Sequence, residues 1–451
     1  MTRHETDVVL ALTRRYLGMI EGRELSLDEK QAFIAETVEA YERHVNRGYI
    51  GYRKSVTEAG QFAALEWSGN GSVLRDLLDR EYIDCLGGYG IFSAGVNHPT
   101  IVKAVTDQIH RMALNSQELL EPWRAALAKV LAEITPGELQ NSFFINNGTD
   151  AIEGAIKLAR LYTRRHTFIS TLGGFHGKSL GSLSLMGKAS FREPFQSGLQ
   201  DVRFVPYGDA AALEDELDRC DAVGTHIAGV VLEPVQGEAG GVVPPDDYLP
   251  RARAACTRYG ALLIADEIQT GMGRTGKLWG VDHWQVVPDI MCLGKSIGGG
   301  VMPLSAFIAS AKVWEVMIPN PIIHSTTFGG NPIACAAGLA AIEVTLEEDL
   351  PGQAASKGDF LLRELAALQR KYPQVLAEAH GKGLLIGMEF QTQEIGWAVA
   401  AGLFKRGVLV AGTYSKAQVI RIEPALGIPQ RLLEEMLGRL EETFKEVARS
   451  L

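Results

Sequence analysis

Short apolar runs alternate with amphipathic stretches through the middle of the chain, between about residues 95 and 345. Runs that are continuously apolar, rather than alternating with polar residues, are typical of parallel strands that helices bury on both faces. We therefore predict a large α/β domain with a mostly parallel sheet. Its strands are predicted at Ser142–Ile145, Thr167–Ser170, Val202–Val205, Gly229–Leu232, Ala261–Ile264 and Ile290–Leu293.

The two ends of the chain have different patterns. Residues 1–50 predict helices, because Ser26 and Glu29 have the spacing of a capping box and apolar residues follow at helical intervals. After about residue 345 the pattern indicates a smaller α+β domain, with strands at 383–390, 408–411 and 419–422 and an amphipathic C-terminal helix through Leu432–Val447. We predict three regions: a helical extension at 1–94 that also contributes to the small domain, the large domain at 95–345, and the small domain at 346–451.

Composition narrows the class of protein. The 451 residues include 44 Lys and Arg against 54 Asp and Glu, a formal net charge of −10, and 46% are hydrophobic. These values indicate a globular chain and argue against a nucleic-acid partner, which requires a basic face.

The most extended apolar run, Ile333–Ile342, is shorter than the roughly 20 residues that span a bilayer. The first residues are polar where a signal peptide would begin its apolar core. We expect a soluble, cytoplasmic protein without a membrane partner.

Cysteine and histidine spacing indicates neither a disulfide framework nor a metal site. The five cysteines are widely spread without a CxxC pair, and the ten histidines include no HExxH motif. Cys292 and Cys335 lie in apolar runs and are predicted to be small core residues. No metal is assigned.

Polar and ionisable residues follow four of the predicted strands. In open α/β sheets, ligands bind just beyond the carboxyl ends of the strands, so these residues are the candidates for a site. They are Asn146–Asp150, Glu233–Glu238, Asp266–Gln269 and Gly294–Ser296.

Two glycine-rich motifs do not fit nucleotide binding. Gly271–Gly276 matches GxGxxG, but the residues after it do not predict the helix that a dinucleotide fingerprint opens. Gly173–Ser179 resembles a P-loop but has three residues between its glycines where four are needed. We interpret the first as a glycine-rich active-site loop.

Three strand-end features together indicate one cofactor. Gly148 and Thr149 open a predicted helix, whose free N–H groups bind anions, although an ordinary N-cap has the same pattern. Asp266 ends an apolar strand, either as a buried structural carboxylate or as the partner of a cation. Lys295 follows another strand, either as a rim lysine or as a desolvated nucleophilic amine. A phosphate seat, a carboxylate for a pyridinium nitrogen and a Schiff-base lysine are what pyridoxal phosphate requires.

At these positions the chain resembles the class III pyridoxal-phosphate aminotransferases. The motifs that carry the resemblance are Glu233–Gly240, Ala265–Gly276, Leu293–Ser296 and Thr326–Pro332. The resemblance implies the fold-type-I architecture and a homodimer. Within the family the chain is most similar to bacterial putrescine (diamine) aminotransferases, through its N-terminal extension and the segments Tyr52–Val56, Asp84–Phe92, Ser116–Leu120 and Phe175–Ser179.

The resemblance also implies roles for individual residues. Lys295 would form the Schiff base, Asp266 would meet the pyridinium nitrogen, and Gln269 would contact the ring hydroxyl. Phe175 would stack on the ring, with His176 and Glu233 beside it. The phosphate would be bound by Gly148 and Thr149 together with Thr327 of a partner subunit. Glu238 and Arg421 would form a pair that opens for a substrate carboxylate, although a structural salt bridge would have the same sequence pattern.

Five further positions bear on the phosphate seat or the substrate. Relatives often carry Ser where Asn147 stands, and Asn can still donate a hydrogen bond. Enzymes acting on 4-aminobutyrate or ornithine carry Arg where Lys178 stands, and a lysine lacks the bidentate fork that grips a carboxylate. Tyr89 aligns with an aromatic residue of the substrate channel. Gln117 and Glu118 would lie at the channel mouth, where Glu118 could attract an ammonium group or simply be solvated.

We therefore predict a transaminase that moves the terminal amino group of a diamine, putrescine or cadaverine, to 2-oxoglutarate or pyruvate. With putrescine the product would be 4-aminobutanal, which cyclises to 1-pyrroline. The alternative is an ω-amino-acid transaminase acting on 4-aminobutyrate, ornithine or acetylornithine. Other classes are a pyridoxal-phosphate decarboxylase or aminomutase, and a non-catalytic protein on the same fold. The sequence leaves open the preferred amine, the preferred acceptor, and whether dimers pair into tetramers.

Overall fold

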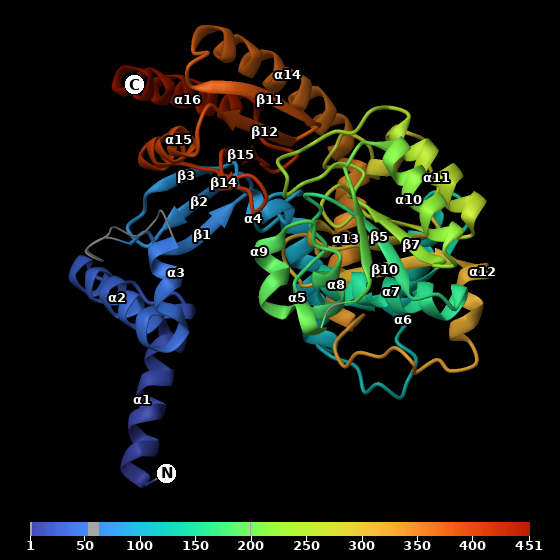
Figure 1. Cartoon of the computed structure of the whole chain (residues 1–451). Coiled ribbons are helices and arrows are strands. Elements are labelled where there is room, and N and C mark those ends of the chain that lie inside the picture. Colours follow the sequence, from blue (N-terminus) through green and yellow to red (C-terminus); the bar gives the residue numbers. More distant parts are fainter. Residues whose placement is uncertain (1, 53–62, 199) are drawn as a thin grey trace. The chain divides into compact units, whose positions relative to one another are not determined.

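The computed structural model describes residues 2–52, 63–198 and 200–451, in two units that we treat separately (Figure 1). One unit comprises Met1–Ser68 and Leu74–Glu81, and the other comprises Gly69–Val73 and Tyr82–Leu451. In the described part of the chain, no helix has the length and apolar character that crossing a membrane requires.

The first unit is mostly helical, which confirms the prediction for residues 1–50. It contains α1 (Arg3–Ile20), α2 (Leu27–Ala40), the π-helix η1 (Tyr41–Asn46) and α3 (Arg47–Tyr52). Ser26 and Glu29 form the expected capping box at the start of α2. Arg15 of α1 pairs with Glu36 of α2 through two hydrogen bonds of 3.0 and 2.6 Å. The predicted family segment Tyr52–Val56 lies, from residue 53 onward, outside the described residues.

A sheet of seven strands forms the centre of the second unit. Its order is β4 (Leu139–Ile145), β10 (Ser305–Ser310), β9 (Ile290–Leu293), β8 (Leu262–Asp266), β7 (Ile227–Leu232), β5 (Thr167–Thr171) and β6 (Val202–Val205). All six predicted strands are confirmed. The sequence analysis did not identify β10, which runs antiparallel to both β4 and β9, whereas the strands from β9 to β6 are parallel.

Both faces of this sheet are covered by helices (Figure 1). Leu262 and Ile264 of β8 pack in one core cluster with α7 (Gly148–Thr163), whereas Leu263 and Ala265 belong to the core on the other face. Each fully buried Leu or Ile contributes about 1.5–3 kcal/mol. The other face is covered by α5 (Pro99–Arg111), α6 (Pro122–Ile134), α10 (Ala210–Ala222), α11 (Tyr248–Tyr259) and α13 (Pro332–Glu347).

A second, antiparallel sheet lies in the C-terminal part of the chain. Its order is β11 (Leu376–Lys382), β12 (Leu385–Phe390), β15 (Val419–Ile422) and β14 (Ala411–Gly412). Three helices accompany it: α14 (Leu350–Lys371), α15 (Gln393–Lys405) and α16 (Gln430–Ser450). The predicted strand at 408–411 is divided between β13 (Val408–Leu409), which pairs in parallel with β3 (Glu81–Asp84), and β14. A large helix-covered sheet with a smaller sheet domain confirms the predicted fold class, while the domain boundaries at 94/95 and 345/346 stay predictions.

The remaining elements are short. They are β1 (Glu66–Asn70), β2 (Val73–Asp76), α4 (Gly87–Gly90), α8 (Leu180–Ser184), α9 (Ala189–Arg192), α12 (Ala311–Trp314), and the 3₁₀ helices η2 (Glu193–Gly198), η3 (Gly280–His283), η4 (Lys295–Gly298) and η5 (Glu315–Met317). Residues 271–276 form turns rather than a helix N-terminus, so this motif does not open the helix of a dinucleotide fingerprint. All five cysteines are free and buried, so Cys292 and Cys335 are core residues as predicted.

Candidate active site

The polar residues predicted to form a site lie at the carboxyl ends of neighbouring strands. Asp266 is the last residue of β8, and Glu233 directly follows β7. Lys295 opens η4 just after β9. Because β7, β8 and β9 are parallel neighbours, their carboxyl ends meet at one edge of the sheet. The sheet topology therefore brings these side chains to the same edge.

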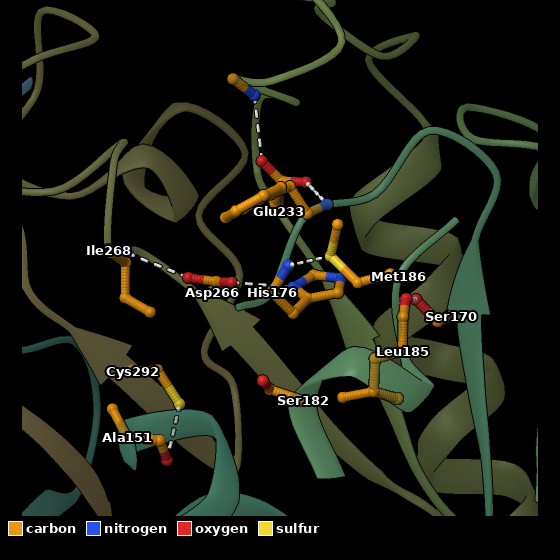
Figure 2. A network of polar contacts seen from close by, with 12 residues as sticks. Ala151, Ser170, His176, Ser182, Leu185, Met186, Glu233, Asp266, Ile268 and Cys292 are labelled. Carbon is orange, nitrogen blue, oxygen red and sulfur yellow. Dashed lines mark hydrogen bonds and ion pairs between the residues drawn. The ribbon is translucent and has the colours of Figure 1, made fainter. Parts of the chain in front are cut away.

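Asp266 is held by a buried histidine (Figure 2). Its Oδ2 lies 2.7 Å from His176 Nδ1, and its Oδ1 accepts a hydrogen bond of 3.1 Å from the Ile268 N–H. Burial opposes protonation of His176, but the hydrogen bond with Asp266 and the nearby carboxylates raise the pKa of His176 above its ordinary value. The carboxylate keeps lone pairs for a further donor. Among the described residues, the buried His176 Nε2 has no hydrogen-bond partner.

Glu233 organises the backbone beside this pair. Its two carboxylate oxygens accept hydrogen bonds from the Phe175 N–H at 3.0 Å and the Gly237 N–H at 2.9 Å. Burial raises the pKa of Glu233 to about 7, with nearby His176 lowering it and nearby Asp266 raising it. Glu233 thus fixes the segment that carries Phe175 and His176 (Figure 2).

Lys295 has an unusual backbone and a perturbed amine. Its φ is +48°, in the left-handed region that few non-glycine residues adopt. Burial lowers the pKa of Lys295, and Glu423 is foremost among the carboxylates that oppose this. A lowered pKa increases the fraction of neutral, nucleophilic amine near neutral pH.

The N-terminus of α7 forms a polar pocket with a neighbouring loop. Asn147 caps the helix by accepting the Asp150 N–H at 3.0 Å. Thr149 Oγ1 lies 2.7 Å from Ser179 Oγ and 2.6 Å from Ser182 Oγ. The Ser179 hydroxyl already donates to Glu153 Oε1 at 2.6 Å. The first N–H groups of a helix have no intrahelical acceptor, so these groups, with Thr149, would favour an anion at the start of α7.

Phe175 belongs to an aromatic cluster around Lys178. Its ring stacks on Tyr414, with centroids 5.6 Å apart and planes at 16°. The ammonium nitrogen of Lys178 lies 5.8 Å from the centroid of Phe175, 4.7 Å from that of Phe191 and 4.3 Å from that of Tyr414. We call Phe175, Phe191 and Tyr414 the aromatic cage. Cation–π attraction holds the lysine ammonium there.

Arg421 is fully buried between two carboxylates. Its Nη2 lies 2.8 Å from Glu238 Oε1, and its Nη1 lies 3.4 Å from Glu423 Oε2. Glu423 Oε1 in turn accepts a 2.5 Å hydrogen bond from the Gln269 amide. Burial lowers the pKa of Arg421, but the two carboxylates more than offset it and the net shift is upward. The guanidinium also lies 5.6 Å from the ring centroid of Tyr89.

Three predicted residues lie on exposed loops instead. Gln117, Glu118 and Thr327 are exposed, and the Gln117 amide donates to the Thr327 carbonyl at 2.7 Å. The backbone N–H of Glu118 meets only the Ser116 hydroxyl, at 3.4 Å. The structure therefore places Gln117 and Thr327 together, on a surface of this chain.

The sequence analysis missed several residues of the site. Glu423 directly follows strand β15, so the rule that selected the other strand ends would have found it had it been applied to the smaller sheet. Ser179 and Ser182 meet Thr149 only through tertiary structure, as Tyr414 meets Phe175, and no local pattern marks these contacts.

Comparisons with known proteins agree with this geometry. The family model described as aminotransferase class-III matches residues 57–444. Ornithine aminotransferase from Toxoplasma gondii is 30% identical, with a TM-score of 0.80, over 90% of this chain and 98% of that chain. Acetylornithine aminotransferase from Elizabethkingia anophelis is 29% identical, with a TM-score of 0.77, over 91% and 99%. An (S)-enantioselective ω-transaminase from Thermomicrobium roseum is 28% identical, with a TM-score of 0.83, over 92% and 98%.

Proposed function

The chain belongs to the class III aminotransferases, and on that premise we propose that it transfers the terminal amino group of an ω-amino acid to a 2-oxo acid. Its cofactor is pyridoxal phosphate. This substrate assignment was the alternative in the sequence analysis, behind a diamine. It is now favoured because the similar structures include enzymes named for ornithine and acetylornithine, and because of how Lys178 is held.

The residues at the sheet edge fit the cofactor. The α7 N-terminus with Thr149 offers hydroxyl and N–H donors for the phosphate, and Asp266 retains acceptor capacity for the pyridinium nitrogen. Gly177 makes this packing possible, since a Cβ atom there would lie 2.3 Å from Thr149 Oγ1. Glu233 would support the ring indirectly by fixing Phe175, and Gln269 would reach the ring hydroxyl. When bound, pyridoxal phosphate supplies an electron sink for the carbon that loses its proton.

Lys295 would carry the proton during the reaction. Its Nζ has a pKa lowered by burial, so it can accept a proton from the donor carbon and return it to the cofactor carbon on the other side of the transferred nitrogen. His176 keeps Asp266 oriented throughout, because their buried contact of 2.7 Å fixes the carboxylate beside the histidine. The buried residues around Glu233 and Asp266 exclude water from this proton transfer.

The aromatic cage carries the proposal for the donor. A free lysine ammonium is a flexible point charge and a weaker carboxylate ligand than arginine. Here three rings surround the ammonium of Lys178, and within the described residues no carboxylate forms a salt bridge with it. A fixed cation without a counter-ion attracts the distal carboxylate of an ω-amino acid and repels the distal ammonium of a diamine. Arg421 would release Glu238 and hold the carboxylate of the 2-oxo acid.

A diamine remains the second candidate, on a different observation. Glu238 and Glu423 place two carboxylates beside Arg421 and within electrostatic reach of Lys295, and these carboxylates would favour a cationic donor. Putrescine or cadaverine would then give the aminoaldehyde.

We further propose a homodimer in which Thr327 contributes to the partner's phosphate site. Thr327 is exposed, as Gln117 beside it is. Large apolar side chains are exposed on the same two loops, with Leu120 at 99%, Ile322 at 78% and Phe328 at 56% relative exposure. Apolar surface of this kind is typical of an interface. Gel filtration with light scattering tests the dimer, and a monomer at all concentrations would contradict it.

A single-turnover spectrum tests the donor. The cofactor-loaded enzyme is mixed separately with 4-aminobutyrate, ornithine, acetylornithine and putrescine, without an acceptor. We expect an ω-amino acid to convert the absorbance of the lysine-linked cofactor into that of the amine form, and Lys178→Met to raise its KM about tenfold or more. Lys103→Met, which removes an exposed lysine paired with Asp107, is the control.

Three results would contradict the proposal. Conversion by putrescine alone would assign the diamine reaction. Product formed beyond one equivalent per active site without any 2-oxo acid would indicate a decarboxylase or aminomutase, and the absence of cofactor binding would indicate a non-catalytic protein.

A further inference from the structure

Glu423 is a buried carboxylate to which the proposed ω-amino-acid reaction assigns no role. It is 0% exposed and directly follows β15, with its backbone N–H donating to the Cys85 carbonyl at 2.8 Å. Isolated buried charges are expensive unless a partner compensates them. Glu423 Oε1 has the Gln269 amide, but Oε2 has no hydrogen-bond partner in the described part of the chain. This oxygen is only 3.4 Å from Arg421 Nη1, which is itself without a hydrogen bond there.

The backbone around residues 87–90 is shaped to admit this carboxylate. A Cβ atom on Gly87 would lie 2.0 Å from the Glu423 carbonyl oxygen. A Cβ atom on Gly90 would lie 3.3 Å from Glu423 Oε1 and 3.7 Å from Lys295 Cδ. Gly90 has a φ of +93°, which an ordinary side chain would strain. The Glu423 carboxylate and the Lys295 stem therefore flank one small space.

Glu423 balances more than one cation. Glu238 and Glu423 both face Arg421, and Glu423 also interacts with the buried guanidinium of Arg274, so the loss of Glu423 would make this set of charges one unit more positive. An aminotransferase receives an ammonium-bearing donor and a carboxylate-bearing acceptor in the same pocket. A more positive fixed charge beside the reacting lysine therefore weakens the binding of the ammonium-bearing donor and strengthens the binding of the carboxylate-bearing acceptor.

We infer that Glu423 is a specificity-determining residue that offsets Arg421, so that one pocket accepts both cationic donors and anionic acceptors. The inference rests on the proposed aminotransferase reaction. Glu423 would act on the substrates through the electrostatic potential of its carboxylate and through its contact with Arg421. It takes no part in making or breaking bonds. Gln269 holds Glu423 Oε1, which leaves Oε2 directed at Arg421.

The test is Glu423→Gln in the full-length, cofactor-loaded enzyme, which keeps the shape and an acceptor for Gln269 but removes the charge. We expect the KM of the amino donor to rise and the KM of the 2-oxo acid to fall, so that the ratio of the two kcat/KM values shifts on the order of tenfold. If Glu423 had a purely structural role, its replacement would weaken the binding of the donor and of the acceptor together. Glu389→Gln on β12, where Glu389 meets Gln418 and Lys416, is the matched control and should leave the ratio unchanged.

Binding measured without turnover separates the inference from the proposed reaction. Calorimetry with glutarate, an unreactive dicarboxylate, should show tighter binding to the Glu423→Gln protein than to the wild type, by on the order of tenfold. If the Gln variant does not fold, Glu423→Met removes the same charge at similar volume. Equal or weaker glutarate binding in the folded variant would overturn the inference. A wild-type protein that binds glutarate but transfers no amino group would overturn the proposed reaction instead.

Discussion

His176 Nδ1 lies 2.7 Å from Asp266 Oδ2 in a buried pair, and this contact fixes the orientation of the carboxylate at the end of β8. Removing one partner of a buried pair leaves the other uncompensated, which costs more than the hydrogen bond itself contributes. The pair is therefore a sensitive point of the site even before any cofactor binds.

His176→Phe fills the volume but cannot bond to Asp266, and we expect it to lower the free energy of unfolding of the apo protein by about 2 kcal/mol or more. Since the folded-state pKa of His176 is raised, this stabilisation is fully present below about pH 6.5 and declines as the pH rises through the raised value. Denaturant unfolding at several pH values measures it. His226→Phe, at an exposed histidine 3.2 Å from Asp221, is the control and should change stability by less than about 0.5 kcal/mol.

Glu233→Gln should change how stability depends on pH. Burial raises the pKa of Glu233 to about 7, so its folded state favours the protonated carboxyl. Through this group the free energy of unfolding of the wild type therefore falls by about 2 kcal/mol between pH 5 and 8, whereas that of the variant does not. The difference in unfolding free energy, wild type minus variant, should fall as the pH rises. A difference that stays constant, even if large, would show that Glu233 ionises with an ordinary pKa.

Gly177→Ala should weaken cofactor binding at the α7 N-terminus. The added Cβ would lie 2.3 Å from Thr149 Oγ1, and the φ of +118° disfavours alanine. Displacing Thr149 removes a hydroxyl from the anion pocket, and we expect the Kd of the cofactor to rise about tenfold or more. Fluorescence titration of the apo protein measures this. Gly224→Ala has a φ of +76° but no atom within 4 Å, so it imposes the backbone cost alone and should leave the Kd unchanged.

Gly154→Ala should destabilise the large sheet by about 1–3 kcal/mol. Gly154 lies on α7, and a Cβ there would lie 2.1 Å from the Phe307 ring of β10. The same substitution at Gly438 of α16 meets no atom within 4 Å, and should stabilise by up to about 1 kcal/mol through helix propensity. Thermal unfolding of both variants checks the prediction. Equal effects would mean that α7 does not approach β10 so closely.

The sheet could be predicted from the sequence because its strands are continuously apolar. The helices at both ends follow from apolar periodicity and from the cap at Ser26. Strand β10 was missed because its run Ser305–Ser310 begins and ends in serine and gains its place only by pairing with β4 and β9. The sequence does not encode such a pairing locally.

In the candidate site, too, some residues have a local sequence signal and others are defined only by tertiary contacts. Asp266, Glu233 and Lys295 could be predicted because each follows an apolar strand, where a polar group requires an explanation. The position of Lys178 was recognised, but the effect of its environment was not, since the surrounding rings come from residues 175, 191 and 414. Contacts between such distant segments depend on the tertiary fold.

The late position of β10 in the sequence also affects how the protein folds during synthesis. In the described sheet, β4 lies at one edge and its partner there is β10, which is synthesised after β5 to β9. Until β10 has been synthesised, the backbone N–H and C=O groups of β4 have no partner strand, and an unpaired strand can bind another chain. Nascent chains that stop before residue 305 should therefore require a chaperone to stay soluble.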